Sequence, residues 1–432
     1  MGNHPDAGKI VEEKRNRTLE TTFLKFSNGV SVTLKHTDNK NNDILMDAWR
    51  WGGSHNYSLQ NKENATHAAR IVQLMGVKDL SKTDLDKMLA GKNVHVLPYI
   101  NPYEEGIEGN CSATNFKEFI QLVNLYFTQP RKDETIFKAY IEKEKGYTKN
   151  LKANPLNYFN DTLIKIEYQS NPWAWGIPTA EEYDRINLDS AFKIYKEIFS
   201  NAYGMHFTFV GSFDIESMKQ DLVLILGSLP STPMENKFND EGLRPVKGIV
   251  ERTIQKGQEK QSMVNITFTG EAPYNHEEEL KLKMLTEVMH MEVMDKLRGS
   301  MNGIYKADIA SSFSKRPYQH YTINIKFPCG AENIDTLTQA VFDIVKNVQE
   351  QKINRQYVNK VKEMMKDYHA GSLKRDEYLL HFLSHSWIDQ EDPDWLNDYY
   401  NLVENISLRE LKETAIKYFD MNNYIKVVLK PE

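Results

Sequence analysis

The chain has 432 residues, of which 40% are hydrophobic and 26% charged, and its formal net charge is −6. This composition is typical of a globular protein, and the length suffices for roughly two to four domains. Acidic and basic residues are interleaved without a basic block, so charge gives no reason to expect nucleic acid or an anionic membrane as partner. No apolar run reaches the ~18 residues of a transmembrane helix.

The first half of the chain predicts an α+β domain over residues 21–229, after a polar opening segment. Residues 1–20 carry few apolar side chains and no signal-peptide pattern, so we expect a polar linker or the edge of a longer chain. Asn28 and Gly29 between two alternating runs are a strong hairpin signal. Further strands are expected at 44–51, 94–100 and 206–210, and helices at 63–75, 82–89, 115–127, 133–151, 156–166, 189–199 and 215–226.

The second half repeats this order. Residues 230–248 are polar with three prolines and predict an inter-domain linker, so the second domain covers residues 249–432. Strands are expected at 254–269, 304–311, 320–327 and 424–429, and helices at 277–297, 333–349, 355–369, 375–388 and from 407 onward. Similar segments, 185–188 and 405–408, precede the last helices of the two halves. We predict two tandem homologous α+β domains, each an antiparallel-type sheet covered by helices.

One pair of histidines has the spacing of a metal site. Among 12 histidines, His381 and His385 are four residues apart on a predicted helix, as two ligands of one zinc ion can be. A zinc peptidase also needs a carboxylate base beside the metal-bound water, and the corresponding position holds Ser384. The favoured interpretation is a helix face with polar or partly buried histidines.

A second candidate, His67, lies early in the helix that follows Gly52 and Gly53. The residues three and four positions further on are Arg70 and Ile71, which cannot serve as general base and second ligand. We therefore expect His67 to be structural or exposed.

No motif of nucleophilic catalysis is present in the sequence. There is no Gly-x-Ser-x-Gly elbow and no phosphate-binding glycine-rich loop. Cys111 and Cys329 lie far apart, and neither belongs to a Cys-x-x-Cys pair or carries a flanking signature. The sequence leaves open whether these two cysteines form a disulfide.

The most informative segment runs from residue 297 to residue 305, Leu-Arg-Gly-Ser-Met-Asn-Gly-Ile-Tyr. It is predicted to lead from the end of a long helix, through an Asn-Gly turn, to the start of a strand. An arginine at a helix C-terminus is favourable for the helix dipole, and a tyrosine in a strand is ordinary. From these residues alone, a structural role for Arg298 and Tyr305 is the simpler interpretation.

This segment resembles the signature of the C-terminal half of pitrilysin- and insulysin-type zinc peptidases, the inverzincins of the insulinase family. In that half a helix ends in Leu-Arg and a Tyr follows the Arg by seven residues, as Tyr305 follows Arg298. Residues 26–32, 51–54, 210–214 and 427–431 are also similar to family patterns in the right order. The resemblance covers nearly the whole chain, extends to long bacterial zinc proteases, and implies the fold of mitochondrial processing peptidase-like metallohydrolases.

The resemblance also implies that zinc binding and substrate binding are carried out by different halves of the enzyme. The catalytic half of the family carries His-x-x-Glu-His on the helix where residues 67–71 here are His-Ala-Ala-Arg-Ile. This chain would therefore bind no metal, and Zn²⁺ would lie in an N-terminal half, in the same polypeptide or in a separate subunit. Arg298 and Tyr305 would bind the peptide substrate and stabilise the oxyanion, in trans to the zinc.

Two other functions remain open at this point. Some family members have lost catalysis, so the chain could be an inactive peptide-binding or structural scaffold subunit. It could also hydrolyse peptides alone through His381 and His385, which we predict it does not. Several long bacterial members with this layout are exported, so the resemblance favours the periplasm.

Overall fold

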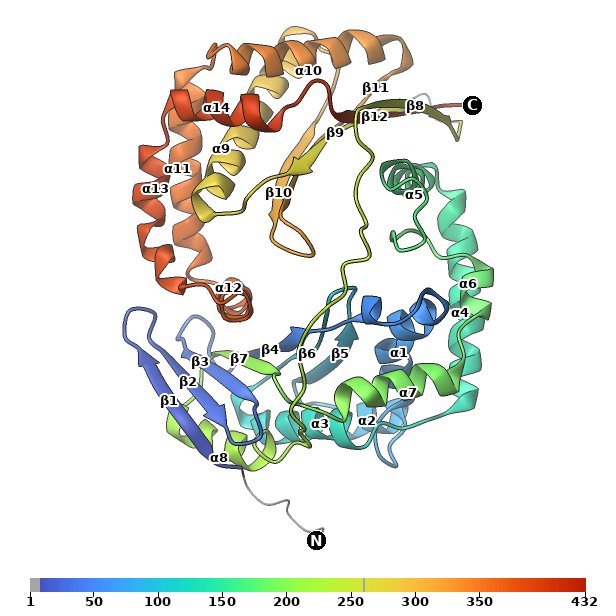
Figure 1. Ribbon diagram of the computed structural model, residues 1–432, viewed down its shortest axis with the longest axis vertical. Helices are drawn as coiled ribbons and strands as arrows, with labels where there is room; N and C mark the ends of the chain where they lie inside the picture. Colours follow the sequence, from blue (N-terminus) through green and yellow to red (C-terminus); the bar gives the residue numbers. More distant parts are fainter. Residues whose placement is uncertain (1–7, 259–260) are drawn as a thin grey trace. The chain divides into compact units, whose positions relative to one another are not determined.

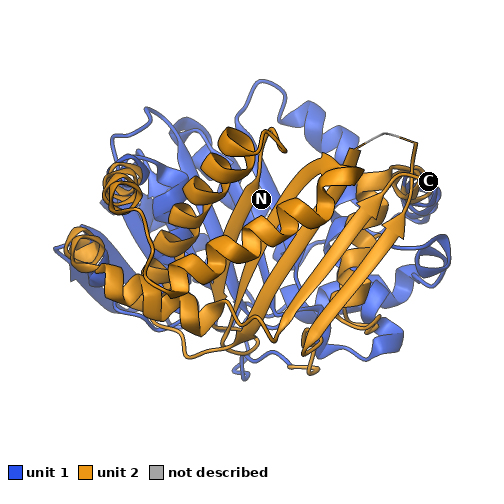
Figure 2. Cartoon of the chain, turned by 90° about the horizontal axis from the view of Figure 1, so that it is seen from above, with its two compact units in different colours: residues 1–147, 178–239, 370–396 blue, residues 148–177, 240–369, 397–432 orange. Residues whose placement is uncertain are grey.

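The computed structural model describes residues 8–258 and 261–432 (Figure 1). The chain forms two compact units that interleave in sequence (Figure 2). Unit 1 consists of residues 1–147, 178–239 and 370–396, and unit 2 of residues 148–177, 240–369 and 397–432. Within the described ranges, none of the helices combines the length and the apolar character needed to cross a bilayer.

Unit 1 is built on a seven-stranded sheet with the order β1-β2-β3-β7-β4-β6-β5. β3 and β7 are parallel, and the other neighbours are antiparallel. The strands are β1 Ile10–Asn16, β2 Thr21–Phe26, β3 Ser31–His36, β4 Ile44–Trp51, β5 Val94–Ile100, β6 Glu104–Cys111 and β7 His206–Gly211.

Helices cover one face of this sheet. α1 (Lys62–Met75) and α3 (Phe116–Thr128) pack on β5, and α7 (Leu188–Phe199) packs on both of these helices. The buried stripes of these helices and of α8 meet the apolar side of the strands and form the main core. The remaining helices of this part are α2 Lys82–Met88, α6 Ala180–Asp184 and α8 Ile215–Ile225, and α4 Glu134–Ala153 begins in unit 1 and ends in unit 2.

The other face of the unit 1 sheet is partly covered by α12 (Asp376–Ile388), which packs on β7 and β4. Trp387 of this helix stacks on His206 of β7, with ring centroids 4.5 Å apart. The sequence-based boundaries assigned this helix to the second domain, but its contacts group it with unit 1. α12 packs on β4 and β7, which lie far from it in the sequence. Domain boundaries inferred from the sequence alone therefore could not place this helix.

Unit 2 is built on a five-stranded sheet with the order β10-β11-β9-β12-β8. Its strands are β8 Ile249–Gln255, β9 Gln261–Glu271, β10 Asp308–Ser314, β11 His320–Gly330 and β12 Tyr424–Lys430. α9 packs on β10, and α10 and α14 pack on β9. The helices of this part are α9 His276–Val293, α10 Ile334–Gln349, α13 Tyr399–Asn405 and α14 Leu408–Tyr418, together with α11 Arg355–Ser372, whose last three residues are grouped with unit 1.

A helix from the first half of the sequence, α5 (Pro155–Glu167), also belongs to unit 2. It packs on β12, where Phe159 is buried against Ile425 and Val427. Each sheet therefore receives one helix from the other half of the sequence.

The two sheets share one topology. In unit 1, β3 to β7 occur in the spatial order first, fifth, second, fourth, third, and β8 to β12 of unit 2 occur in that same order. The first and fifth strands are parallel in both sheets, and the other neighbours are antiparallel. The predicted fold class, two homologous α+β domains with sheets covered by helices, is confirmed.

Three local differences from the sequence-based expectations have physical causes. Part of the predicted linker 1–20 forms β1, a charge-rich edge strand paired with β2, and residues 1–7 lie outside the described residues. β6 was not predicted because it is acidic and carries Gly106 and Gly109. A Cβ at Gly106 would lie 2.2 Å from the Ala48 carbonyl oxygen. The strand predicted at 304–311 begins at Asp308, so Tyr305 precedes it.

A buried ion pair links strands β4 and β6 at the centre of unit 1. Arg50 of β4 is 1% exposed and Glu105 of β6 is 5% exposed. The Arg50 Nε donates to Glu105 Oε1 at 2.8 Å, and its other nitrogens donate to three backbone carbonyls at the end of α7 and just beyond it. The second carboxylate oxygen, Glu105 Oε2, accepts a hydrogen bond from the Gly53 amide at 3.0 Å. The pair thereby fixes the strand end that leads into α1.

Replacing Glu105 by Ala should lower the free energy of unfolding by about 3–5 kcal/mol, because Arg50 would remain buried without its counter-charge. Urea denaturation followed by circular dichroism measures this loss. The matched control is Glu134→Ala, which removes an ion pair with Lys138 whose side chains are both 71% exposed. Its expected cost is much smaller, because water screens an ion pair between exposed side chains. Equal losses in the two variants would contradict a central role for the buried pair.

Candidate functional site

Arg298 lies where the winding of α9 changes. The helix continues beyond Val293 as a π-helical turn, Met294–Ser300, and Arg298 is exposed in its last turn. Leu297 is completely buried, and its carbonyl accepts a hydrogen bond from the Gly303 amide at 2.8 Å. π-helical turns often occur at functional sites, because they change the direction of side chains relative to a regular helix.

The connection from this turn to β10 presents Tyr305 to solvent. Asn302 adopts a left-handed conformation with φ of 51°, which turns the chain away from the helix. Ile304 and Ala307 are 7% and 5% exposed, whereas Tyr305 between them is 79% exposed. The loop is therefore anchored in the core on both sides of a projecting tyrosine.

Arg298 and Tyr305 meet at one pocket of unit 2. The guanidinium carbon of Arg298 lies 5.3 Å from the centroid of the Tyr305 ring, within the range of a cation–π contact. Both side chains line an open pocket of about 710 Å³, together with Gln261, Asn302 and Cys329. The structure brings together the two residues singled out from the sequence, and their catalytic role remains a prediction.

The resemblance places the expected zinc motif on α1, and the structure gives His67 of that helix other partners. His67 Nδ1 lies 2.8 Å from the Tyr140 hydroxyl, and its Nε2 lies 4.0 Å from the Glu63 carboxylate. Burial lowers the pKa of His67 to about 4. Arg70 hydrogen-bonds Gln73 on the same helix, and Ile71 is 1% exposed in the core. This arrangement fits a structural histidine and does not fit a zinc site.

The second histidine pair also lacks a ligand set. The rings of His381 and His385 lie 4.1 Å apart, and burial lowers the pKa of His381. Ser384 between them is completely buried. Across residues 8–258 and 261–432, no three His, Cys, Asp or Glu side chains are grouped so that they could hold a metal ion. Cys111 and Cys329 are both free and buried.

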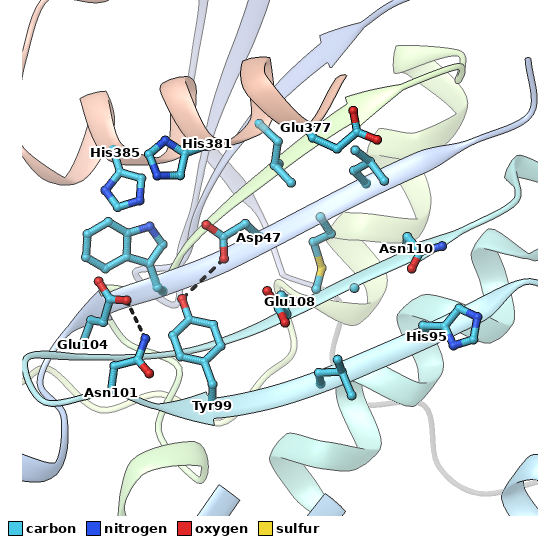
Figure 3. Close-up of a pocket in the computed structure, with 16 residues that line it drawn as sticks. Asp47, His95, Tyr99, Asn101, Glu104, Glu108, Asn110, Glu377, His381 and His385 are labelled. Carbon is cyan, nitrogen blue, oxygen red and sulfur yellow. Dashed lines mark hydrogen bonds between the residues drawn. The ribbon is translucent and has the colours of Figure 1, made fainter. Parts of the chain in front are cut away.

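The sequence did not reveal a pocket beneath α12 (Figure 3). Asp47 of β4 and Tyr99 of β5 line it, together with Glu104 and Glu108 of the unpredicted β6. The available signal was Asp47, a carboxylate among alternate positions of β4 that otherwise hold Leu45, Trp49 and Trp51. The contribution of α12 depends on a contact between residues more than 300 positions apart, such as that between Trp49 and Ser384.

Comparison with known proteins defines the class of this fold. Residues 185–365 match the family model described as the peptidase M16 inactive domain. The sequence is 19% identical to the probable zinc protease PqqL of Escherichia coli strain K12, over 98% of this chain and 46% of PqqL. The predicted resemblance to the inactive half of a pitrilysin-type zinc peptidase is confirmed.

Solved structures show the same fold. The periplasmic protease PqqL from Escherichia coli superimposes with a TM-score of 0.85 at 16% identity, over 100% of this chain and 48% of that one. The ferredoxin protease FusC, in complex with Arabidopsis ferredoxin, gives 0.85 at 15% identity over 100% and 47% of the two chains. A peptidase M16 inactive domain from Pseudomonas fluorescens gives 0.79 at 13% identity over 96% and 99%. The chain thus spans about half the length of PqqL and FusC.

The environment of His67 predicts a pH dependence of stability. Its pKa is about 4 in the folded protein against 6.5 for a free histidine, so the unfolded chain binds more protons between these values. The free energy of unfolding is not reduced by His67 above about pH 6.5. It decreases as pH falls from 6.5 towards 4, by up to ~1.4 kcal/mol per pH unit, because the unfolded chain binds the proton more readily.

Urea denaturation across this pH range should show a shallower loss for His67→Gln than for the wild type. Glutamine does not titrate and can still hydrogen-bond Tyr140. Parallel curves for the two proteins would show that His67 is not held neutral by burial.

Proposed function

We propose that this chain is the non-catalytic half of a zinc-dependent endopeptidase, which closes over a zinc-bearing half, binds peptide and stabilises the tetrahedral intermediate. The observation that carries this proposal is the exposed pair of Arg298 and Tyr305 at one pocket, 5.3 Å apart from guanidinium to ring. Their spacing in sequence is that of the family signature, and residues 185–365 match the M16 inactive domain.

Each of the two side chains has a role that its chemistry suits. The hydroxyl of Tyr305 can donate a hydrogen bond to the oxygen that becomes negative as the scissile carbonyl is attacked. The guanidinium of Arg298 has several donors in a fixed planar geometry and can bind a backbone carbonyl of the substrate. Contact with Arg298 orients the tyrosine ring before substrate arrives, so less reorganisation is needed during the reaction.

The partner in this proposal is a zinc-binding N-terminal half, in the same polypeptide or as a separate subunit. The described residues of this chain provide no metal site, and PqqL and FusC are about twice its length. Zinc in that half would act as the Lewis acid that activates water. The substrates are peptides or unfolded segments. The similarity to PqqL, a periplasmic protease, supports a periplasmic location.

An alternative is a peptide-binding or structural scaffold without catalysis. The presence of Arg70 and Ile71 at the positions of the motif's Glu and second His is compatible with it. The discriminating feature lies in the partner: a His-x-x-Glu-His motif with a distant Glu, encoded upstream or in a neighbouring reading frame, supports the peptidase. If no such motif is encoded there, the scaffold is the correct function.

In an assembled enzyme, Tyr305→Phe and Arg298→Ala should each lower kcat by about 100- to 1000-fold, because each removes a donor used in the transition state. Steady-state cleavage of a quenched fluorescent peptide by the two joined halves measures the effect. Tyr147→Phe and Lys306→Ala are matched controls, since Tyr147 is an exposed tyrosine and Lys306 is the exposed neighbour of Tyr305. An unchanged kcat in both site variants would remove the assigned roles.

The isolated chain should neither bind a stoichiometric zinc ion nor cleave peptides. His381 and His385 supply two nitrogen ligands, and the described residues add neither a third ligand nor a base beside them. Metal analysis after dialysis against Zn²⁺, with a peptide assay in the presence and absence of a chelator, tests this. One equivalent of zinc together with chelator-sensitive cleavage, both lost in His385→Ala, would establish an active site in this chain.

A further inference from the structure

A short turn in unit 2 determines how Tyr305 lies relative to Arg298. Arg298 belongs to the π-helical turn Met294–Ser300 that follows α9, whereas Tyr305 belongs to the loop that leads to β10. Between these two segments the chain turns away from the helix at Asn302 and Gly303. The 5.3 Å contact between the guanidinium and the tyrosine ring therefore depends on the shape of this turn.

Backbone hydrogen bonds hold the turn against the end of the helix. The Gly303 amide donates to the Leu297 carbonyl at 2.8 Å, and the Met301 amide donates to the Lys296 carbonyl at 2.9 Å. Asn302, between these two donors, has φ of 51°, a left-handed conformation that asparagine and glycine adopt more readily than other residues. A β-branched residue is strongly disfavoured in this conformation. The path of the turn therefore requires a residue such as asparagine at this position.

A buried side chain of α10 limits the turn on another side. Leu337 is 1% exposed and lies so close to Gly303 that a Cβ on the glycine would be 2.6 Å from Leu337 Cδ2, 3.1 Å from Cδ1 and 3.3 Å from Cγ. These distances are shorter than the roughly 3.5–4.0 Å at which carbon atoms attract each other. Because the leucine is packed in the core, it has little space to move into. A larger residue in place of Gly303 would therefore push the turn away from α10.

A displacement of the turn would reach Tyr305. Gly303 stands two positions before the tyrosine, and both line the open pocket that Arg298 also lines. Ile304 and Ala307, on either side of Tyr305, are buried at 7% and 5% exposure, so the loop has little freedom to absorb a shift. Misplacement of a catalytic group by on the order of 1 Å can lower a rate about 100-fold.

We propose that Leu337 of α10 is a positioning residue for Tyr305. Its packing on Gly303, together with the left-handed turn at Asn302, sets where the tyrosine hydroxyl lies relative to Arg298. Leu337 is not among the described residues that line the pocket, so it acts through the turn. The effect on catalysis rests on the proposed function of Arg298 and Tyr305, whereas the effect on the geometry of this pair does not.

The geometry is tested in the whole chain without a partner. Fluorine NMR of a chain with 3-fluorotyrosine in place of Tyr305 gives one resonance, which Arg298→Ala should shift because the cation beside the ring is lost. Gly303→Ala should move the resonance towards the value in Arg298→Ala. Adding Leu337→Ala should return it towards the wild-type value, because the shorter side chain leaves room for the new methyl group.

Gly299→Ala is the matched control for Gly303→Ala. Gly299 belongs to the same segment, but a Cβ there would have Asp295 Oδ1 as its nearest neighbour, at an ordinary 3.6 Å. The resonance of this variant should stay at the wild-type value.

In an enzyme assembled from both halves, Gly303→Ala should lower kcat by about tenfold or more with little change in KM, because the tyrosine acts in the transition state. Adding Leu337→Ala should recover most of the lost kcat, whereas in the wild-type background the same substitution should not raise kcat. Asn302→Val should have a kcat about tenfold below that of Asn302→Gly. This second pair tests the turn without adding a group beside Leu337.

Recovery by Leu337→Ala separates positioning from general destabilisation, since shortening a buried leucine makes the fold less stable and would otherwise lower activity further. An unchanged resonance and kcat in Gly303→Ala, no recovery in the double variant, or equal kcat values in the two Asn302 variants would each overturn the proposal. If the resonances follow the expected order but Tyr305→Phe leaves kcat unchanged, the proposed function is wrong and the positioning of Tyr305 by Leu337 is supported.

Discussion

The ion pair between Arg50 and Glu105 is the constraint on which unit 1 depends. Both side chains are almost completely buried, so their charges are tolerable only because each finds its partner and several further hydrogen bonds. The pair links two central strands to the end of α7 and to the Gly53 amide. In this chain that strand end leads to α1, whose His67 is hydrogen-bonded to Tyr140.

Exchange of helices between the two halves of the sequence shapes both sheets. α12 covers part of one sheet and α5 part of the other, so each unit needs both halves of the sequence to be complete. This exchange creates the pocket beneath α12, because the strands alone would present Asp47 and Trp49 on an open face. In unit 2, the buried residues on both sides of Tyr305 hold the loop that carries it. The proposed binding residue Tyr305 thus lies on a loop that buried neighbours anchor to the core.

The sequence predicted the fold class because hydrophobic periodicity and turn residues agree with each other over most of the chain. The predicted starts of the helices at 215 and near 407 agree with caps in the structure: Asp214 caps α8, and Ser407 with Glu410 forms a capping box at α14. β6 escaped prediction, because glycines and acids replace the usual alternation where backbones approach closely. The pairing of Arg298 with Tyr305 came from a family spacing, whereas the exposure of Tyr305 follows from burial of Ile304 and Ala307, which spacing does not encode. The Asp47 pocket depends on contacts between distant segments and could not be predicted.

In the proposed function, this chain completes a peptidase whose metal lies elsewhere. The most direct measurement compares peptide cleavage by a separately produced zinc-binding half before and after this chain is added at saturating concentration. We predict that cleavage is close to background with either half alone and rises by about 100-fold or more when both are present, since substrate-binding and oxyanion donors are then supplied. Full activity of the zinc-binding half alone, unchanged by this chain, would contradict that role.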